Sequence, residues 1–412
     1  MAVIRPFQAI RPTGDLAPRV AALPYDVYDR EEARAEALRD PLSFLNIDRP
    51  ETQFEKEHDI YAPDVYVKAA DMLGKEQREG VLAEDPEECY YLYRLTMNGR
   101  HQTGIVACAS IDDYRNGVIK KHENTREDKL QDRIRHVDVT GIQTGPIFLA
   151  YRHDEEIAQV TERVCTATPI FDFVSADGIA HQGWRIDDPD DMEKIAAAFA
   201  RMDRIYIADG HHRAESAVRA GLMRRERHPG YTGEEEFNYF LSVLFPDDEL
   251  MIMDYNRVVR DLAGLDPEQL FEELRKVCTI RACSVEEAPS RKGEFQIYVN
   301  GQWYLAQFRP EVCSEDAVAG LDVSILQDRV LSPLFGIDDP KTDSRIEFVG
   351  GIRGWEELEK RTDKWGGIAF RMYPTSIAEL MAVADSGALM PPKSTWFEPK
   401  LRSGLFMHRI GQ

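Results

Sequence analysis

The chain has 412 residues, which is enough for two or three hydrophobic cores of ordinary size. Hydrophobic residues make up 43% and charged residues 30%, a composition typical of globular proteins. The formal net charge of −22 argues against nucleic acid as a partner, because binding to phosphate backbones depends on basic patches. No apolar run approaches the roughly 18 residues of a membrane span, and no signal peptide is visible, so we expect a cytoplasmic protein with no membrane partner.

The first half of the chain predicts alternating strands and helices. Asp29, followed three residues later by Glu32, has the capping-box pattern and predicts a helix that runs to about residue 39. Asn98-Gly99 separates two apolar stretches and predicts a β-hairpin between residues 90–97 and 103–110. Further strands are expected at residues 3–10, 146–151 and 204–208, and further helices at residues 190–202 and 211–225.

The second half continues with strands at 240–245 and 250–255, which we expect to pair, and then changes its pattern. A helix at 267–277, strands at 295–299 and 303–308, and a helix at 321–335 are expected there. Residues 390–400 contain too much proline for a helix and form a tail. We therefore predict an α/β (α+β) protein with a core in residues 1–261 and a C-terminal α/β subdomain in residues 262–412.

The strongest functional motif is Asp209-Gly210-His211-His212-Arg213, placed where a predicted strand ends and a helix begins. The start of a helix offers unpaired N–H groups and a partial positive charge, so it readily binds an anion. Gly210 lets the backbone approach a ligand closely, and Arg213 can grip a phosphate with two N–H groups. The motif therefore predicts a phosphate-binding turn.

Two other interpretations of this motif are weaker. His211 and His212 could be incidental polar residues, but cations in a first helical turn oppose the helix dipole, and a bound anion would offset this. A transition-metal site is disfavoured, because adjacent histidines on a helix point in different directions. A bound phosphate is the interpretation that explains both the glycine and the cations.

Two earlier segments could supply catalytic or substrate-binding groups. Asp26, in the turn Pro24-Tyr25-Asp26-Val27, either closes the turn or acts as a general base. The stretch His122-Glu123-Asn124-Thr125 is either a solvated charged face or part of a site that uses His122, Glu123 and Thr125. The lysines before Glu123 favour its ionised form, which makes it a weaker base and a better anchor for a substrate amine.

A fourth segment lies in the closing tail. Lys393, Ser394 and Thr395 offer donors suited to an anionic substrate, and a purely structural strap is the alternative.

These segments together resemble the DUF1015 family over nearly the whole chain. The resemblance rests on Ile4-Arg5-Pro6-Phe7, residues 22–27, residues 122–125, residues 209–213, Leu321-Asp322-Val323 and residues 390–405. The chain departs from the family pattern at Asn256-Arg257, where His-Arg is expected, and at Asn124, where lysine is commoner.

The run Asp-Gly-His-His-Arg also resembles the phosphate-binding signature of the ParB/sulfiredoxin-like superfamily. That superfamily includes archaeal free-serine kinases with the same run, ParB partition proteins that bind CTP, and sulfiredoxins that use ATP. The resemblance implies a mixed-sheet core with a nucleotide at this turn, without fixing the reaction. His211 stands where sulfiredoxin chemistry needs a cysteine, and no basic helix-turn-helix follows Leu222.

The resulting hypothesis is a nucleotide-dependent kinase that phosphorylates the hydroxyl of a small metabolite, with free L-serine as the expected acceptor and O-phosphoserine as the product. ATP or ADP would be the donor, with Mg²⁺ as cofactor and a homodimer as a compatible assembly. A nucleotide-binding regulator without kinase activity is the alternative. The expected roles are phosphate binding by Gly210, His211, His212 and Arg213; catalysis by Asp26, Asp209 or Glu123; Mg²⁺ binding by Asp209; and substrate binding by His122, Thr125, Lys393, Ser394 and Thr395.

Overall fold

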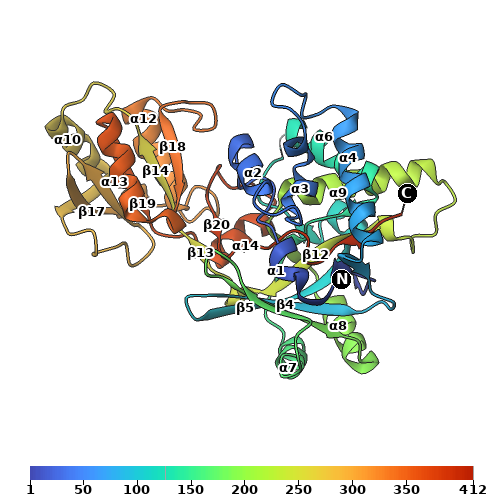
Figure 1. Cartoon of the computed structure of the whole chain (residues 1–412). Helices are drawn as coiled ribbons and strands as arrows, with labels where there is room; N and C mark the ends of the chain where they lie inside the picture. The colour runs from blue at the N-terminus through green and yellow to red at the C-terminus, as the bar shows by residue number, and fades with distance from the viewer. Residues whose placement is uncertain (126, 412) are drawn as a thin grey trace. The chain divides into compact units, whose positions relative to one another are not determined.

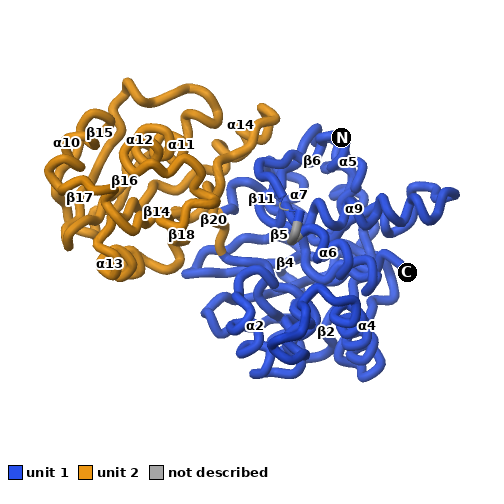
Figure 2. Tube along the Cα trace, turned by 90° about the horizontal axis from the view of Figure 1, so that it is seen from above, with its two compact units in different colours: residues 1–250, 399–412 blue, residues 251–398 orange. Residues whose placement is uncertain are grey.

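Residues 1–250 and 399–412 form one compact unit, unit 1, and residues 251–398 form a second, unit 2 (Figure 2). This computed structural model describes residues 1–125 and 127–411, without the side chains of residues 128 and 129. The predicted boundary lies near residue 261, with the tail in the second part. In the structure the boundary lies at residue 250, and residues 399–412 belong to unit 1.

Unit 1 is built on a mixed β-sheet, which has nine strands within the described residues. The strand order is β6-β11-β8-β12-β5-β4-β10-β9, and β1 pairs with β5. The pairs β12–β8 and β11–β6 are parallel, and the other pairs of this sheet are antiparallel. The strands are β1 (Ile4–Arg5), β4 (Tyr90–Met97), β5 (Arg100–Ser110), β6 (Ile119–Lys120), β8 (Ile147–Tyr151), β9 (Phe171–Val174), β10 (Ala180–Ile186), β11 (Ile205–Asp209) and β12 (Tyr239–Pro246).

Local sequence explains two of the predicted elements directly. Asn98 and Gly99 have φ of 51° and 77°, the positive values that a tight hairpin turn requires, and β4 and β5 pair as predicted. Helix α2 (Arg30–Ala37) begins with a complete capping box, in which Asp29 accepts from the Glu32 backbone and Glu32 accepts from the Asp29 backbone.

Apolar faces of the helices build the core of unit 1. Ala214, Ala217 and Val218 of α9 join residues of α7, α8 and the sheet in one cluster, and Leu222 packs against it, as its spacing predicts. Helices α7 and α8 lie side by side (Figure 1). The helices of unit 1 are α1 (Ala17–Val20), α2, α3 (Leu45–Asp48), α4 (Pro63–Arg78), α5 (Ile111–Arg115), α6 (Glu127–Thr140), α7 (Glu155–Val164), α8 (Pro189–Arg201) and α9 (His211–Arg227).

The closing residues 399–412 belong to unit 1 because their apolar side chains are buried there. Phe406 is 1% exposed and packs against Tyr91 and Tyr93 with ring centroids 5.2 and 6.0 Å apart. The tail also pairs through β21 (His408–Arg409) with β7 (Ile142–Gln143). A further small sheet joins β2 (Ile10–Pro12) to β3 (Leu82–Glu84).

Unit 2 contains an antiparallel sheet with the order β15-β17-β16-β19-β14-β18. Leu358 of α13 packs on one face of this sheet with Val258 and Val349. Phe335 of α12 contacts Phe370 of β19, with ring centroids 6.2 Å apart. The strands are β13 (Ile252–Met253), β14 (Tyr255–Val259), β15 (Cys278–Ala282), β16 (Glu294–Val299), β17 (Gln302–Phe308), β18 (Ile346–Gly350), β19 (Ile368–Met372) and β20 (Trp396–Phe397). The helices are α10 (Pro267–Val277), α11 (Asp322–Leu326), the π-helix η6 (Gln327–Leu331), α12 (Ser332–Phe335), α13 (Gly354–Trp365) and α14 (Ile377–Asp385).

Two local predictions are wrong. Residues 3–10 do not form one strand: β1 ends at Arg5 and β2 begins at Ile10, because Pro6 has no N–H to continue the ladder. The expected pairing of 240–245 with 250–255 does not occur, since β12 pairs with β5 and β8, while β14 pairs with β18 and β19 in unit 2.

The fold class is confirmed: a mixed-sheet α/β core accompanied by a further α/β unit. Within the part of the chain that the structure describes, no helix is both long enough and apolar enough to cross a bilayer.

Candidate functional site

The turn between β11 and α9 has the backbone that the motif predicts. Asp209 ends the strand, Gly210 adopts the left-handed conformation with φ +91°, and α9 begins at His211. A Cβ atom on Gly210 would lie 3.2 Å from both Nε and Nη2 of Arg213, so the guanidinium rests against the turn. The N-cap residue Gly210 has no side chain with which to cap α9, and the backbone N–H groups at a helix start suit an anion.

Arg213 is held in place by the neighbouring strand. Its Nη1 donates to the carbonyl oxygen of Pro146 over 2.8 Å, just before β8. A guanidinium carries five N–H donors, so this bond leaves several for a ligand. The side chain is half-buried, which strengthens any hydrogen bond that it makes to an anion.

Asp209 forms an ion pair with a residue that the sequence analysis does not place in the site. Its Oδ2 accepts from Nζ of Lys400 over 2.9 Å, and its Oδ1 accepts from the Gly210 backbone over 2.8 Å. Burial favours the neutral acid, but the positive charges of Lys400 and Arg213 outweigh it and hold the pKa of Asp209 well below its usual range. Asp209 is therefore an ionised carboxylate and a weak base.

His122 and His211 lie against each other, so the structure joins the 122–125 stretch to the turn. Their ring centroids are 4.4 Å apart at 85°, and the His122 backbone N–H points to Nε2 of His211 over 3.5 Å. Burial lowers the pKa of His122 to about 4 despite the opposing charge of Asp209. Burial, followed by the charge of His122, also lowers the pKa of His211 well below its ordinary value. Both rings are neutral near neutral pH.

The neutral state of His211 corrects one step of the sequence analysis. His211 does not add a cation to the first turn, but its neutral ring N–H and its backbone N–H are both donors that a phosphate could use. Its Nδ1 lies 3.7 Å from Oε2 of Glu123, a half-exposed carboxylate. Nδ1 of His122 is buried without a hydrogen-bond partner among the described residues. Thr125 and His212 are half-buried in the same two segments.

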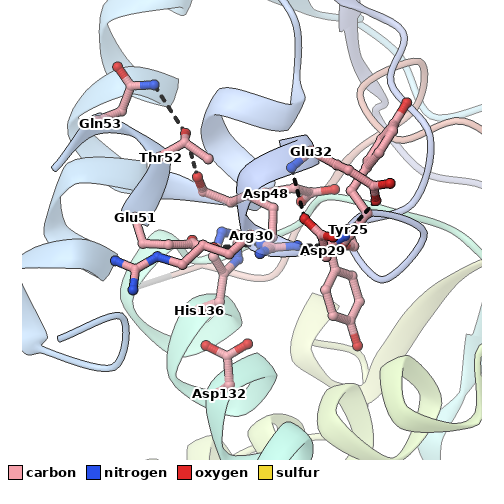
Figure 3. A network of polar contacts seen from close by, with 12 residues as sticks. Tyr25, Asp29, Arg30, Glu32, Asp48, Glu51, Thr52, Gln53, Asp132 and His136 are labelled. Atoms are coloured by element: carbon pink, nitrogen blue, oxygen red, sulfur yellow. Dashed lines mark hydrogen bonds and ion pairs between the residues drawn. The ribbon is translucent and has the colours of Figure 1, made fainter. Parts of the chain in front are cut away.

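Asp26 occupies an exposed position on its turn, while the adjacent Tyr25 points inward. The turn is closed by the Val27 N–H, which donates to the Pro24 carbonyl oxygen over 3.1 Å. Nη1 of Arg49 donates to the carbonyl oxygens of Tyr25 and Tyr28 over 2.9 and 3.0 Å, which fixes the turn from inside. Figure 3 shows this region, in which Tyr25 and, on α6, Asp132 and His136 are labelled.

A cavity of about 30 Å³ joins this turn to the start of α9. Oδ1 of Asp48 accepts from Oγ1 of Thr144 over 2.7 Å, and Nη1 of Arg133 donates to the Asp48 carbonyl oxygen over 3.2 Å. Arg133 also lies over the Tyr25 ring, 4.2 Å from its centroid. The polar residues that line the cavity are Tyr25, Asp48, Arg133, His136, Gln143, Thr144, Arg213, Ser216 and Ser403.

Lys400, Asp48, Arg133 and Thr144 are not among the site residues predicted from the sequence. Lys400 lies in the closing tail, but the residues predicted there are 393–395. Asp48, Arg133 and Thr144 carry no local signal, because only the tertiary fold brings them to the cavity.

Lys393, Ser394 and Thr395 belong to unit 2, and the hydrogen bonds of Lys393 and Ser394 join them to other residues of that unit. Nη2 of Arg257 donates to the Lys393 carbonyl oxygen over 3.0 Å, and Oγ of Ser394 donates to the Pro391 carbonyl oxygen over 2.7 Å. Oγ1 of Thr375 donates to the Ser394 carbonyl oxygen over 3.0 Å. These bonds support the strap interpretation, and a role for the three residues in substrate binding stays a prediction.

The fold and the turn together define a mixed-sheet α/β protein with an uncapped, glycine-led helix start. The family model described as "Protein of unknown function (DUF1015)" matches residues 4–324, and the chain belongs to this family, as predicted. No curated protein matches the sequence.

Solved structures resemble the chain at low identity. A free serine kinase in complex with AMP is 14% identical, with 74% of this chain and 91% of that chain covered and a TM-score of 0.35. SbnI with a C-terminal truncation, from Staphylococcus aureus, is 12% identical, with 71% and 82% covered and a TM-score of 0.37. A conserved hypothetical protein from Pyrococcus furiosus is 16% identical, with 74% and 94% covered and a TM-score of 0.34. Likenesses at these values carry no conclusion about function.

Proposed function

We propose that unit 1 is a nucleotide-dependent kinase that transfers a phosphoryl group to the hydroxyl of a small metabolite, with free L-serine as the acceptor. The observation that carries this proposal is the placement of Arg213. Its guanidinium rests against Gly210 at the start of α9, so a positioned cation and backbone N–H groups converge on one point. Phosphoryl transfer depends mainly on such positioned positive charge.

The phosphates of ATP or ADP would lie on the N–H groups of the first turn of α9, with Arg213 gripping one phosphate. Gly210 permits a close approach because it has no Cβ. Lys400 adds a second cation within 2.9 Å of Asp209. The shared Asp-Gly-His-His-Arg run, which resembles that of archaeal free-serine kinases, supports serine as the acceptor.

The residues at the turn suit Mg²⁺ that arrives on the nucleotide. Among the described residues, no group of three or more His, Cys, Asp or Glu side chains is arranged to hold a metal by itself. Asp209 is ionised and could supply one carboxylate oxygen, and phosphate oxygens would complete the shell. When bound, Mg²⁺ would neutralise charge that develops on the transferring phosphoryl group.

In the proposed step, the acceptor hydroxyl oxygen attacks the terminal phosphorus, its proton passes to a base, and the shortened nucleotide leaves. Asp26 is our proposed base, since Tyr25 beside it lines the cavity that reaches Arg213. Glu123 would anchor the serine amine next to His122 and Thr125. Asp209 is a weak base because Lys400 and Arg213 stabilise its charged form.

The test is to incubate the full chain with serine, Mg²⁺ and either ATP or ADP, and to follow phosphoserine by ³¹P NMR and mass spectrometry. Phosphoserine that appears with one nucleotide and vanishes in Arg213→Ala supports the proposal. Nucleotide binding without transfer to serine or to a panel of small alcohols would favour the regulatory alternative instead.

A further inference from the structure

Unit 2 contains a buried arginine that has no acidic partner among the residues that the structure describes. Arg257 lies on β14 and is 3% exposed. Nη2 donates to the Lys393 carbonyl oxygen over 3.0 Å, and Nη1 donates to the Tyr255 carbonyl oxygen. The guanidinium also lies over the Phe348 ring, 5.3 Å from its centroid.

Arg257 therefore carries its positive charge in buried surroundings that do not stabilise that charge. Within residues 251–398, no carboxylate lies within ion-pair distance of the guanidinium. Burial lowers the pKa of Arg257 to about 10, and only Tyr255 opposes this. A buried charge without a counter-charge is strongly unfavourable, and two carbonyl oxygens occupy only part of the five N–H donors.

The same guanidinium lines a cavity of about 350 Å³. That volume lies within the range of roughly 300–1,000 Å³ that is typical of small-molecule sites. Most of the wall is apolar and comes from α11, η6, β18 and the proline-rich strap. The apolar residues of the wall are Val323, Leu331, Pro340, Phe348, Pro391 and Pro392.

The polar part of the wall limits the kind of anion that fits. Lys341 is exposed and adds a second cation to that of Arg257. Asp338 and Asp339 also line the cavity, and Asp339 is fixed in a turn, where its Oδ1 accepts from the Lys341 backbone over 3.0 Å. These two carboxylates would repel a multiply charged anion such as phosphate more strongly than a singly charged one.

We propose that this cavity binds a small monocarboxylate with a compact apolar body, with the carboxylate on Arg257 and the body against Val323, Leu331 and Phe348. A planar carboxylate can accept two parallel N–H bonds from one guanidinium. The site is separate from the turn at Arg213, and it does not depend on the kinase proposed for unit 1.

The first experiment uses the full wild-type chain, labelled at its valine and leucine methyl groups, with benzoate as the probe. Benzoate should shift the methyl signals of Val323 and Leu331 in a saturable way and leave Leu358, on the other side of the sheet, unchanged. Benzyl alcohol has the same ring without the charge, and inorganic phosphate has charge without the ring. Both should bind at least about tenfold more weakly than benzoate.

The second experiment compares Arg257→Gln with Arg371→Gln by titration with benzoate. Arg371 is a half-buried arginine of β19 that donates to the Val285 carbonyl oxygen over 3.2 Å and to Gln296 over 3.1 Å, and it does not line the cavity. Arg257→Gln should weaken benzoate binding at least about tenfold, and Arg371→Gln should leave it within about twofold.

Three results would overturn the proposal: no saturable shift at Val323 and Leu331, equal binding of benzoate and benzyl alcohol, or equal losses in the two variants. If circular dichroism shows that Arg257→Gln does not fold, the methyl measurements on the wild-type chain decide by themselves.

Discussion

Lys400 and Asp209 are 191 positions apart in the chain, yet Nζ of the lysine lies 2.9 Å from Oδ2 of the aspartate. This ion pair connects the closing tail to the strand end at which the proposed nucleotide would bind. The tail is buried beside the pair, since Leu401 and Ser403 are each 3% exposed. The packing of the tail therefore determines whether Lys400 can balance the negative charge of Asp209 at the turn.

The first prediction concerns this ion pair. Lys400→Gln should lower the free energy of unfolding by about 1 kcal/mol, a modest value because the Asp209 side chain is still 36% exposed to solvent. The folded pKa of Asp209 is depressed, so its stabilisation is fully present above the unfolded pKa of about 4 and is lost only as pH falls below that value. Urea unfolding at about pH 7 and pH 5 should therefore give the same difference between variant and wild type.

A double-mutant cycle with Asp209→Asn isolates the coupling between the two residues. If the two single effects simply add, Lys400 stabilises the fold by packing and not through the charge of Asp209.

The second prediction concerns the buried histidines. A histidine with a lowered folded pKa is protonated first in the unfolded state, so stability falls as pH decreases from about 6.5 towards the folded pKa. For His122, with a folded pKa of about 4, the expected loss between about pH 7 and pH 5 is roughly 2 kcal/mol.

The variant His122→Gln should flatten this pH dependence in urea unfolding, whereas His101→Gln, which changes an exposed histidine of β5, should retain it. An unchanged slope in His122→Gln would show that other groups produce the acid sensitivity.

The third prediction concerns Gly210. Gly210→Ala should lower stability by about 1–2 kcal/mol through its positive φ, and should also displace Arg213, which a Cβ would contact at 3.2 Å. Gly117→Ala is the matched control, because Gly117 has φ +76° and open space around the position of its Cβ. Both variants should lose similar stability in thermal unfolding, but only Gly210→Ala should weaken nucleotide binding by about tenfold or more. Equal nucleotide affinities in the two variants would show that Arg213 does not contact the nucleotide.

The sequence predicts this turn well because each of its signals is local. A strand, a glycine and a helix follow one another, and the chain forms them as β11, Gly210 and α9. Helix α10 also has the predicted bounds, and the structure shows a local cause for its start, a capping box of Asp266 and Gln269.

Predictions fail where the outcome depends on distant parts of the chain. The charge-rich stretch after residue 120 contains α6, whose buried residues Leu130, Ile134 and Val137 have helical spacing that its many charges obscure. The protonation state of His211 could not be predicted, because burial beside His122 determines it and the two are 89 positions apart. The ion pair of Lys400 with Asp209 forms because the closing tail belongs to unit 1. No local sequence pattern predicts that the tail, which follows unit 2 in the chain, packs there.

The fourth prediction concerns Arg213. Arg213→Ala should weaken nucleotide binding by roughly 1.5–3 kcal/mol, the scale of a charge-assisted hydrogen bond. Arg219→Ala is the control, since Arg219 lies on the same helix and pairs with Glu215 over 3.0 Å. Isothermal titration calorimetry should show the loss only in Arg213→Ala. A loss of structure in Arg213→Ala, seen by circular dichroism, would instead mean that its bond to Pro146 holds the fold together.

The fifth prediction separates the roles of the carboxylates. If Asp26 accepts the hydroxyl proton, Asp26→Asn should lower kcat by roughly 10²–10⁴ and leave nucleotide affinity nearly unchanged. Glu123→Gln should mainly raise the KM for serine, because Glu123 is proposed to hold the amine of the acceptor. Initial rates and calorimetry on the two variants, measured with the same nucleotide, check both expectations.

Asp48 is the alternative candidate for the general base, since it is buried and lines the same cavity as Arg213. One of its carboxylate oxygens already accepts from Thr144 over 2.7 Å, so we expect Asp48→Asn to lower stability more than turnover. Thr144→Val removes the same hydrogen bond and leaves the carboxylate in place. If Asp48→Asn abolishes turnover while Thr144→Val retains it, and Asp26→Asn remains active, the base is Asp48. The exposed turn at Asp26 would then serve to position Tyr25 against Arg133.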